Sequence, residues 1–263
     1  MSHPRDAVMG TVYLVGAGPG DPELLTVRAT RLLASADVVY HDDLVPAAIL
    51  NLVSQRACLV SVGKRCGAKR VTQEQINDLL VEAARDGLAV VRLKSGDPML
   101  FGRAAEEIDA LRAHSIPFEV VPGISAAFAA AAALECSLTD RRQASQLLIT
   151  SAHHAASGRP QGDDTTRIVY MPGSDFAGIA RQWMREGLSL SLPCVLVSNA
   201  ARPDQQVQVT TLAELPHALP GPAPLLLLAG RVFADVVSGR STDQLLLQQV
   251  IAASLPGAEG ARD

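Results

Sequence analysis

Residues 11–21 read TVYLVGAGPGD, an apolar run that leads into a loop with three glycines, Gly16, Gly18 and Gly20. A short run of Val, Tyr and Leu bounded by glycines is typical of a buried strand that enters a tight loop. Because glycine has no Cβ, such a loop lets the backbone approach a bound molecule closely. In an open α/β sheet, ligands bind where loops leave the carboxyl ends of the strands. The stretch therefore predicts a cofactor-binding loop.

The spacing of these glycines differs from a dinucleotide fingerprint. That fingerprint is G-x-G-x-x-G, followed at once by a helix whose N-terminus faces the pyrophosphate. Here the spacing is G-x-G-x-G, and the prolines that follow allow a helix only from Pro22 onwards. An acidic residue about 20 positions further on, such as Asp42, keeps a nucleotide as an alternative. A glycine turn without a ligand is another alternative.

Composition favours a soluble, cytoplasmic protein. The chain has 263 residues, 48% of them hydrophobic, which suits one large or two smaller domains. A net charge of −4 argues against nucleic acid or an anionic membrane as the main partner. The four cysteines show no metal-ligand spacing and fit a reducing compartment. We expect no signal peptide and no membrane span, because the N-terminus lacks an apolar stretch and the run 126–134 is too short.

Apolar segments alternate with amphipathic ones through the first half of the chain, which predicts a mostly parallel, wound sheet. The expected strands cover 12–15, 38–40, 59–62, 88–93 and 118–121. The expected helices cover 23–34, 72–85 and 102–113. Thr72 and Gln75 have the spacing of a capping box, which marks the start of the second of these helices.

A second set of segments follows a break at Pro122 and Gly123. A helix rich in small residues is expected at 124–134 and is interpreted as a hinge. The further elements expected are strands at 146–150, 167–171, 194–198, 206–210 and 225–229, and helices at 175–186 and 212–219. The sequence thus predicts an α/β protein with a cofactor cleft between two α/β domains. Their predicted bounds are 1–122 and 123–240, with a C-terminal helix and tail at 241–263.

Polar residues of the first half follow the expected strands. Asp42 follows the second strand, Lys64 the third, the segment 95–98 (SGDP) the fourth and the segment 122–125 (PGIS) the fifth. Because the carboxyl ends of parallel strands share one edge, these loops are expected to converge on one crevice. Each has an ordinary structural explanation by itself, as a helix cap, a solvated side chain or a turn. Their coincidence favours a binding site.

Six motifs extend this interpretation: VYLVGAGPGDPELLT, VVYHDDLV, VGKRCG, RLKSGDPMLFGR, VPGISAA and ARPDQ. In this order they closely resemble the uroporphyrinogen-III C-methyltransferase branch of the tetrapyrrole (precorrin) methylases, from about Val12 to Val232. The resemblance implies the tetrapyrrole methylase fold and two methyl transfers from S-adenosylmethionine to uroporphyrinogen III. The product would be precorrin-2, formed via precorrin-1, on the routes to sirohaem, cobalamin and haem d1. It also implies a homodimer.

The implied reaction needs no metal. A reduced pyrrole ring is an electron-rich carbon nucleophile, and a methyl group on a sulfonium is already activated. The protein has to align carbon, methyl and sulfur, which is mainly an effect of orientation. It also has to move protons as the double bonds of the macrocycle rearrange, which requires a positioned acid and base.

The resemblance assigns catalytic positions to Asp42, Lys64 and Arg103. Asp42 matches the proposed proton acceptor of the family, Lys64 its proposed donor, and Arg103 a position that faces the substrate. An exposed aspartate is a weak base, so Asp42 could instead serve orientation. The further candidates for substrate contacts are Glu106, Arg141 and His153. Eight carboxylates on the substrate would explain arginines beside the site.

The positions that match the cofactor site of the family are Pro19, Ser95, Gly96, Asp97, Leu100, Ser125, Ala126, Met171, Ala200 and Ala229. S-adenosylmethionine carries no phosphate, so backbone groups with one aspartate suit it better than the N-terminus of a helix. Met171 ends an apolar strand, and core packing explains it equally well.

Departures from the family pattern keep other activities open. Ser95 stands for the first glycine of a usual pair, Ala104 and Ala105 for another glycine pair, and Asp140 for a histidine. Residues 171–174 also depart from a common Met-Gly. The alternatives are a methyltransferase for another precorrin, a non-catalytic tetrapyrrole- or cofactor-binding scaffold, and an NAD(P)-dependent oxidoreductase.

Overall fold

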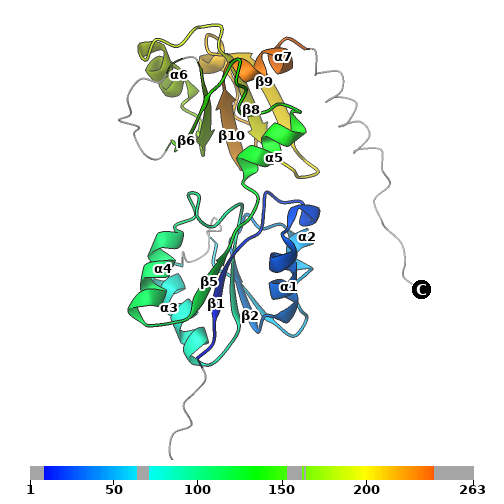
Figure 1. The fold of residues 1–263 in the computed structure, drawn as a ribbon, viewed down its shortest axis with the longest axis vertical. Helices are drawn as coiled ribbons and strands as arrows, with labels where there is room; N and C mark the ends of the chain where they lie inside the picture. The colour runs from blue at the N-terminus through cyan, green and yellow to red at the C-terminus, as the bar shows by residue number, and fades with distance from the viewer. Residues whose placement is uncertain (1–8, 64–70, 153–161, 163, 240–263) are drawn as a thin grey trace, which may run out of the picture. The chain divides into compact units, whose positions relative to one another are not determined.

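The computed structural model describes residues 9–63, 71–152, 162 and 164–239, and its chain divides into two compact units between Ala126 and Ala127 (Figure 1). The elements of the first unit are β1 (Val12–Gly16), the 3-10 turn η1 (Pro22–Leu24), α1 (Val27–Ser35), β2 (Val38–His41), α2 (Ala47–Leu50), β3 (Cys58–Ser61), α3 (Gln73–Arg85), β4 (Val90–Lys94), α4 (Ala104–Ala113) and β5 (Phe118–Val121). The elements that follow are α5 (Ala126–Ala133), β6 (Gln146–Ser151), β7 (Thr165–Tyr170), α6 (Phe176–Arg185), β8 (Pro193–Ser198), β9 (Gln206–Thr211), η2 (Leu215–His217), β10 (Leu225–Ala229), η3 (Arg231–Phe233) and α7 (Ala234–Val237).

The sheet of the first unit has the strand order β3-β2-β4-β1-β5, and each described pair is parallel. The predicted parallel, wound sheet is therefore confirmed. Helices α1 and α2 cover one face, where Leu33 and Ile49 pack with Leu93. Helices α3 and α4 cover the other face, where Leu80 and Leu111 join the same buried cluster (Figure 1). Burial of these leucine and isoleucine side chains stabilises the unit by about 1.5–3 kcal/mol each.

The centre of this sheet is a topological switch point. β1 and β4 are hydrogen-bonded neighbours, yet the helices that follow them, α1 and α4, lie on opposite faces (Figure 1). The chain therefore leaves these two neighbouring strands toward opposite faces of the sheet, which defines a switch point. The fold thus places the glycine loop after β1 at the position where sheets of this type bind ligands.

Local sequence signals explain where two of the helices begin. The capping box predicted at α3 is confirmed, because Thr72 Oγ1 accepts from Gln75 N at 3.2 Å and Gln75 Oε1 accepts from Thr72 N at 2.9 Å. The helix predicted at 23–34 was assigned too early a start. Thr26 caps α1 by accepting from Ala29 N at 3.1 Å, and the preceding residues form the separate turn η1.

The helix predicted at 212–219 is wrong. The structure has only the 3-10 turn η2 there. Pro216 has no N–H and fits only the first turn of a helix, and Pro220 prevents its continuation. Apolar spacing alone was therefore a poor guide in a segment bounded by prolines.

The second sheet is mixed, with the order β6-β7-β10-β8-β9. Only β6 and β7 pair in parallel, and the other described pairs are antiparallel. Phe176 and Trp183 of α6 pack on this sheet against Leu196 and Leu227. The five predicted strands are present, although β7 begins at Thr165, two residues before its predicted start. The predicted C-terminal helix at 241–263 lies outside the described residues.

Within the described ranges, no helix is both long and apolar enough to cross a membrane.

Candidate active site

Three loops meet at the carboxyl edge of the first sheet. Gly18 N donates to Gly96 O at 3.2 Å and Gly96 N donates to Gly18 O at 2.7 Å, which joins the loops after β1 and β4. A Cβ at Gly16 would lie 2.6 Å from Gly123 Cα and 2.7 Å from Gly96 O, so the loop after β5 packs against both. The predicted convergence of these loops is present, and it requires glycine at both Gly16 and Gly123, since a Cβ at Gly123 would lie 2.3 Å from Gly96 O.

Asp97 fixes two of these loops to one another. Its Oδ2 accepts from Gly123 N at 3.0 Å and its Oδ1 accepts from Met99 N at 2.8 Å. Gly96, just before it, has a φ of +69°, the left-handed region that favours glycine. Ser95 has no positive φ, so a serine is accommodated there without backbone strain. Replacement of a glycine by Ser95 therefore leaves the turn intact.

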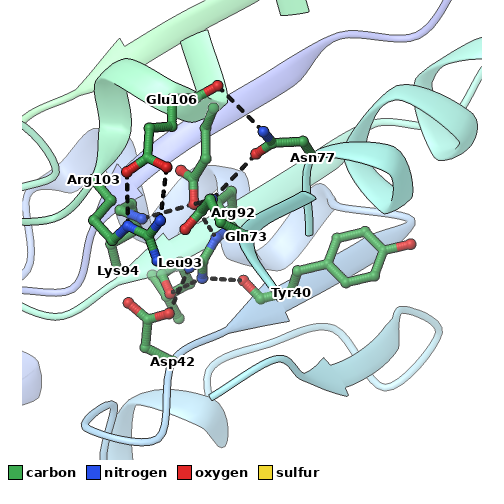
Figure 2. Close-up of polar contacts among 10 residues, drawn as sticks. Tyr40, Asp42, Gln73, Asn77, Arg92, Leu93, Lys94, Arg103 and Glu106 are labelled. Atoms are coloured by element: carbon green, nitrogen blue, oxygen red, sulfur yellow. Dashed lines mark hydrogen bonds and ion pairs between the residues drawn. The ribbon is translucent and has the colours of Figure 1, made fainter. Parts of the chain in front are cut away.

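A row of buried charges extends from Asp42, which follows β2, into the interior of the unit (Figure 2). Arg92 donates to Asp42 Oδ1 at 2.5 Å and to Glu107 Oε1 at 3.0 Å. Lys94 donates to the same oxygen of Glu107 at 2.9 Å. Arg92 and Lys94 are 2% exposed and Glu107 is 0% exposed, whereas the Asp42 side chain keeps 32% of its surface exposed. The row thus connects the interior of the unit to its carboxyl edge.

The Lys94 ammonium is disfavoured by its surroundings. Its pKa is lowered first by burial, which disfavours the charged form, and then by the neighbouring Arg92 guanidinium. Glu107 opposes both effects, since its carboxylate accepts from the ammonium. The charges of Lys94 and Arg92 are therefore held in the interior by the carboxylate of Glu107.

Arg103 lies at the start of α4, and its side chain forms an exposed ion pair beside the buried charges. Its Nε and Nη2 donate to the two carboxylate oxygens of Glu106, both at 2.7 Å (Figure 2). This bond lowers the pKa of Glu106. Both side chains are about half exposed, and an exposed pair of this kind contributes only about 0–1 kcal/mol. A substrate carboxylate could therefore replace Glu106 at small cost and keep the same bidentate geometry.

The predicted cofactor positions of the first unit lie together in the loops just described. They are Pro19, Ser95, Gly96, Asp97, Leu100 and Ser125, with Ala126 at the start of α5. Pro19 and Ser125 are buried, and Leu100 closes the turn of Asp97 through its backbone N–H at 3.2 Å.

The predicted positions of the second unit are divided between the two ends of its sheet. Met171 and Ala200 follow β7 and β8, which run in the same direction and end at one edge. Met171 is exposed and Ala200 is buried. Ala229 ends the oppositely directed β10, where it pairs with Arg167 and Cys194 and is 0% exposed. The structure therefore does not bring Ala229 together with the other two.

The predicted substrate residue Arg141 is exposed in a turn that Asp140 organises. Arg142 donates from Nη2 to Asp140 Oδ2 at 2.6 Å and from Nε to Oδ1 at 3.0 Å. These bonds lower the pKa of Asp140 to about 2. Asp140, where the resemblance led us to expect a histidine, is thus paired with Arg142. Lys64 and His153 lie outside the described residues.

Sequence reasoning missed Arg92, Lys94 and Glu107. A signal for each was present. Arg92 and Lys94 alternate along a strand whose intervening residues are apolar, so they face the same side, toward α3 and α4. Glu107 lies on the buried stripe of α4 formed by Ala104, Ile108 and Leu111. An acidic residue on the buried face of a helix, packed against basic residues on the buried face of a strand, indicates an internal ion pair, because buried charges are normally paired.

The fold and these loops define an α/β protein whose glycine-rich loops meet at the switch point of a parallel sheet, the place where sheets of this type bind small ligands. The sequence model of the Tetrapyrrole (Corrin/Porphyrin) Methylases matches residues 11–216, and the chain belongs to this family. Membership confirms the resemblance found in the motifs and the predicted tetrapyrrole methylase fold.

Individual relatives agree with this assignment. The chain is 44% identical over 238 residues to a uroporphyrinogen-III C-methyltransferase of Paracoccus denitrificans, covering 87% of this chain and 83% of that protein. It is 44% identical to a siroheme synthase of Psychrobacter cryohalolentis, but spans only 45% of that longer protein. Among solved structures, a uroporphyrin-III C-methyltransferase of Thermus thermophilus complexed with S-adenosylhomocysteine matches with a TM-score of 0.72 and 36% identity, covering 86% of this chain and 94% of that one.

Proposed function

We propose that this protein transfers two methyl groups from S-adenosylmethionine to carbon atoms of uroporphyrinogen III. The products would be precorrin-2, formed via precorrin-1, and S-adenosylhomocysteine. Family membership and the similar Paracoccus enzyme support the reaction class. The observation that carries the proposal is the convergence of the Gly18–Gly96 bridge, Asp97 and Gly123 at the switch point.

The residues of the site match the needs of this reaction. S-adenosylmethionine would supply a methyl group already activated on a sulfonium. The bonds that join the three loops fix their geometry before a ligand arrives, so little orientation has to be gained at the moment of transfer. Asp42 presents a carboxylate at the same edge and would accept a proton from the macrocycle. Arg103 would bind a carboxylate of the substrate through the fork that now holds Glu106.

Turnover of uroporphyrinogen III, generated in situ under anaerobic conditions with S-adenosylmethionine, tests the proposal. We expect a product that has gained two methyl groups and a matching release of S-adenosylhomocysteine. Arg103→Ala should raise KM for uroporphyrinogen III by about 10- to 100-fold, the loss of a charged hydrogen bond, with cofactor affinity unchanged. Arg112→Ala, at the other end of α4, is the matched control and should leave KM unchanged.

Two outcomes of this experiment would redirect the proposal. Cofactor binding without a methyl gain would reject uroporphyrinogen III and lead to trials of other precorrins. Absence of turnover on all of them would favour a non-catalytic binding scaffold.

The Asp140–Arg142 pair leads to a further prediction. Arg142→Ala would leave the Asp140 carboxylate uncompensated beside Arg141, the proposed contact for a polyanionic substrate. We expect KM for uroporphyrinogen III to rise about two- to fivefold at low ionic strength and less at high salt, where charges are screened. Asp140→Asn in the same chain should restore KM. An unchanged KM at low salt would place this turn away from the substrate.

We also propose that the protein is a homodimer, as the family resemblance suggests, and that it lies in the cytoplasm, as the cysteine pattern suggests. Sedimentation analysis of the purified protein would measure the oligomeric state, and cell fractionation would test the compartment.

A further inference from the structure

We propose that Arg92 is a positioning residue that holds the Asp42 carboxylate in its working orientation, with Glu107 and Lys94 as its buried support. This inference rests on the proposed function, in which Asp42 accepts a proton. It assigns a role to three buried charges that neither the loops nor the exposed Arg103–Glu106 pair requires.

Each of the three nitrogens of the Arg92 guanidinium donates at least one hydrogen bond. Nε donates to Glu107, Nη2 donates to Asp42 Oδ1, and Nη1 lies 3.4 Å and 3.3 Å from the carbonyl oxygens of Tyr40 and Leu93 (Figure 2). A planar fork with donors fixed on three sides cannot rotate without losing several of these bonds. The position of Asp42 Oδ1 is thereby set by the core of the unit.

Only one oxygen of Asp42 is used in this way. Oδ1 accepts from Arg92, and no described residue donates a hydrogen bond to Oδ2. The side chain is 32% exposed, whereas the guanidinium beneath it is 3% exposed. A carboxylate that is anchored through one oxygen, on a side chain that keeps a third of its surface exposed, suits the role of a proton acceptor.

Glu107 completes the support from α4. Its Oε1 accepts from Arg92, from Lys94 at 2.9 Å and from Gln73 of α3 at 3.3 Å. A Cβ at Gly102 would lie 3.2 Å from Lys94 Cε, so the loop that leads to Arg103 packs directly on the Lys94 side chain. The same buried charges thus underlie both the proposed proton acceptor and the loop of the proposed substrate arginine.

Kinetic measurements on variants would distinguish this role from a merely structural one. If Arg92 served stability alone, a replacement that folds would leave kcat unchanged or would alter binding and turnover together. If Arg92 acts through Asp42, its replacement lowers kcat only while Asp42 is present.

Arg92→Lys tests the proposal because it keeps the charge and removes the fork. We expect kcat to fall about 10- to 100-fold, while S-adenosylmethionine affinity and KM for uroporphyrinogen III stay within about twofold. In an Asp42→Asn background, Arg92→Lys should cause no further loss. Arg167→Lys, which alters a comparably buried ion pair with Glu186 in the second unit, is the control for a general effect and should leave kcat unchanged.

An equal loss of kcat in both backgrounds, or a parallel loss of cofactor affinity, would overturn the inference. So would full activity of Asp42→Asn. If Arg92→Lys does not fold, Glu107→Gln weakens the support of Arg92 from the helix side by removing the carboxylate charge, and the same dependence on Asp42 is expected. If the wild type methylates no uroporphyrinogen III, the proposed function is rejected, but the positioning role of Arg92 can still be tested. Crystal structures of the wild type and Arg92→Lys would test it, since an Asp42 carboxylate that does not move contradicts the positioning role.

Discussion

Replacing Gly16 with alanine is expected to lower S-adenosylmethionine affinity by on the order of 100-fold, because the new methyl group has no room. Its Cβ would lie 2.6 Å from Gly123 Cα and N and 2.7 Å from Gly96 O, all of them backbone atoms. Backbone cannot move aside as the end of a flexible side chain can. The loops after β4 and β5 would therefore have to separate from the loop after β1, which is the arrangement proposed to hold the cofactor.

Calorimetric titration of the folded variant with S-adenosylhomocysteine measures this effect. Gly187→Ala is a suitable control, because Gly187 follows α6 with a φ of +86° and has no atom within 4 Å of an added Cβ. It should cost only about 1 kcal/mol of stability and leave affinity unchanged. Affinity of Gly16→Ala within twofold of the wild type would show that the cofactor does not depend on the close approach of these loops.

The sequence allowed the carboxyl edge of the first sheet to be predicted because its signals are local. Glycines after β1, the SGDP turn after β4 and the PGIS segment after β5 each mark the end of a strand. Parallel strands bring such ends to one edge without any knowledge of distant contacts. The role of Asp97 as the bond between two loops was not predictable, since its partner Gly123 lies 26 positions away.

The buried charges could not be predicted for a related reason. Arg92 bonds to Asp42 across 50 positions and to Glu107 across 15, and no spacing rule within one element connects them. Only the strand order, with β2 beside β4 and α4 above them, brings the three together. In the second unit, the reversed direction of β10 likewise separates Ala229 from Met171, although both end a predicted strand.

Glu107→Leu is expected to lower the free energy of unfolding of the first unit by about 3–5 kcal/mol, the usual cost of removing one partner from a buried ion pair. The carboxylate pairs with both Arg92 and Lys94, and its removal would leave Arg92 with the Asp42 carboxylate alone and deprive the 2% exposed Lys94 of its ion pair. Since proteins are stable by only about 5–15 kcal/mol, such a loss would be a large fraction of the total.

The neighbouring residue provides the matched control. Glu106→Gln removes an exposed carboxylate one position earlier, whose pair with Arg103 should contribute about 0–1 kcal/mol. Urea denaturation followed by circular dichroism, with hydrogen exchange of the β4 amides, measures both variants. Equal stability of the two would mean that the interior charges are solvated.

A second substitution separates the effect of charge from the effect of shape. Lys94→Met in the Glu107→Leu chain removes the cation whose ion pair was with Glu107 and replaces it with an apolar side chain. We expect part of the lost stability to return, because buried ion pairs exchanged for packed apolar residues are often neutral or stabilising. Activity should not return with it, since Arg92 would still lack its support from α4. Stability without turnover would show that this row of charges is retained for the orientation of Asp42 rather than for the fold.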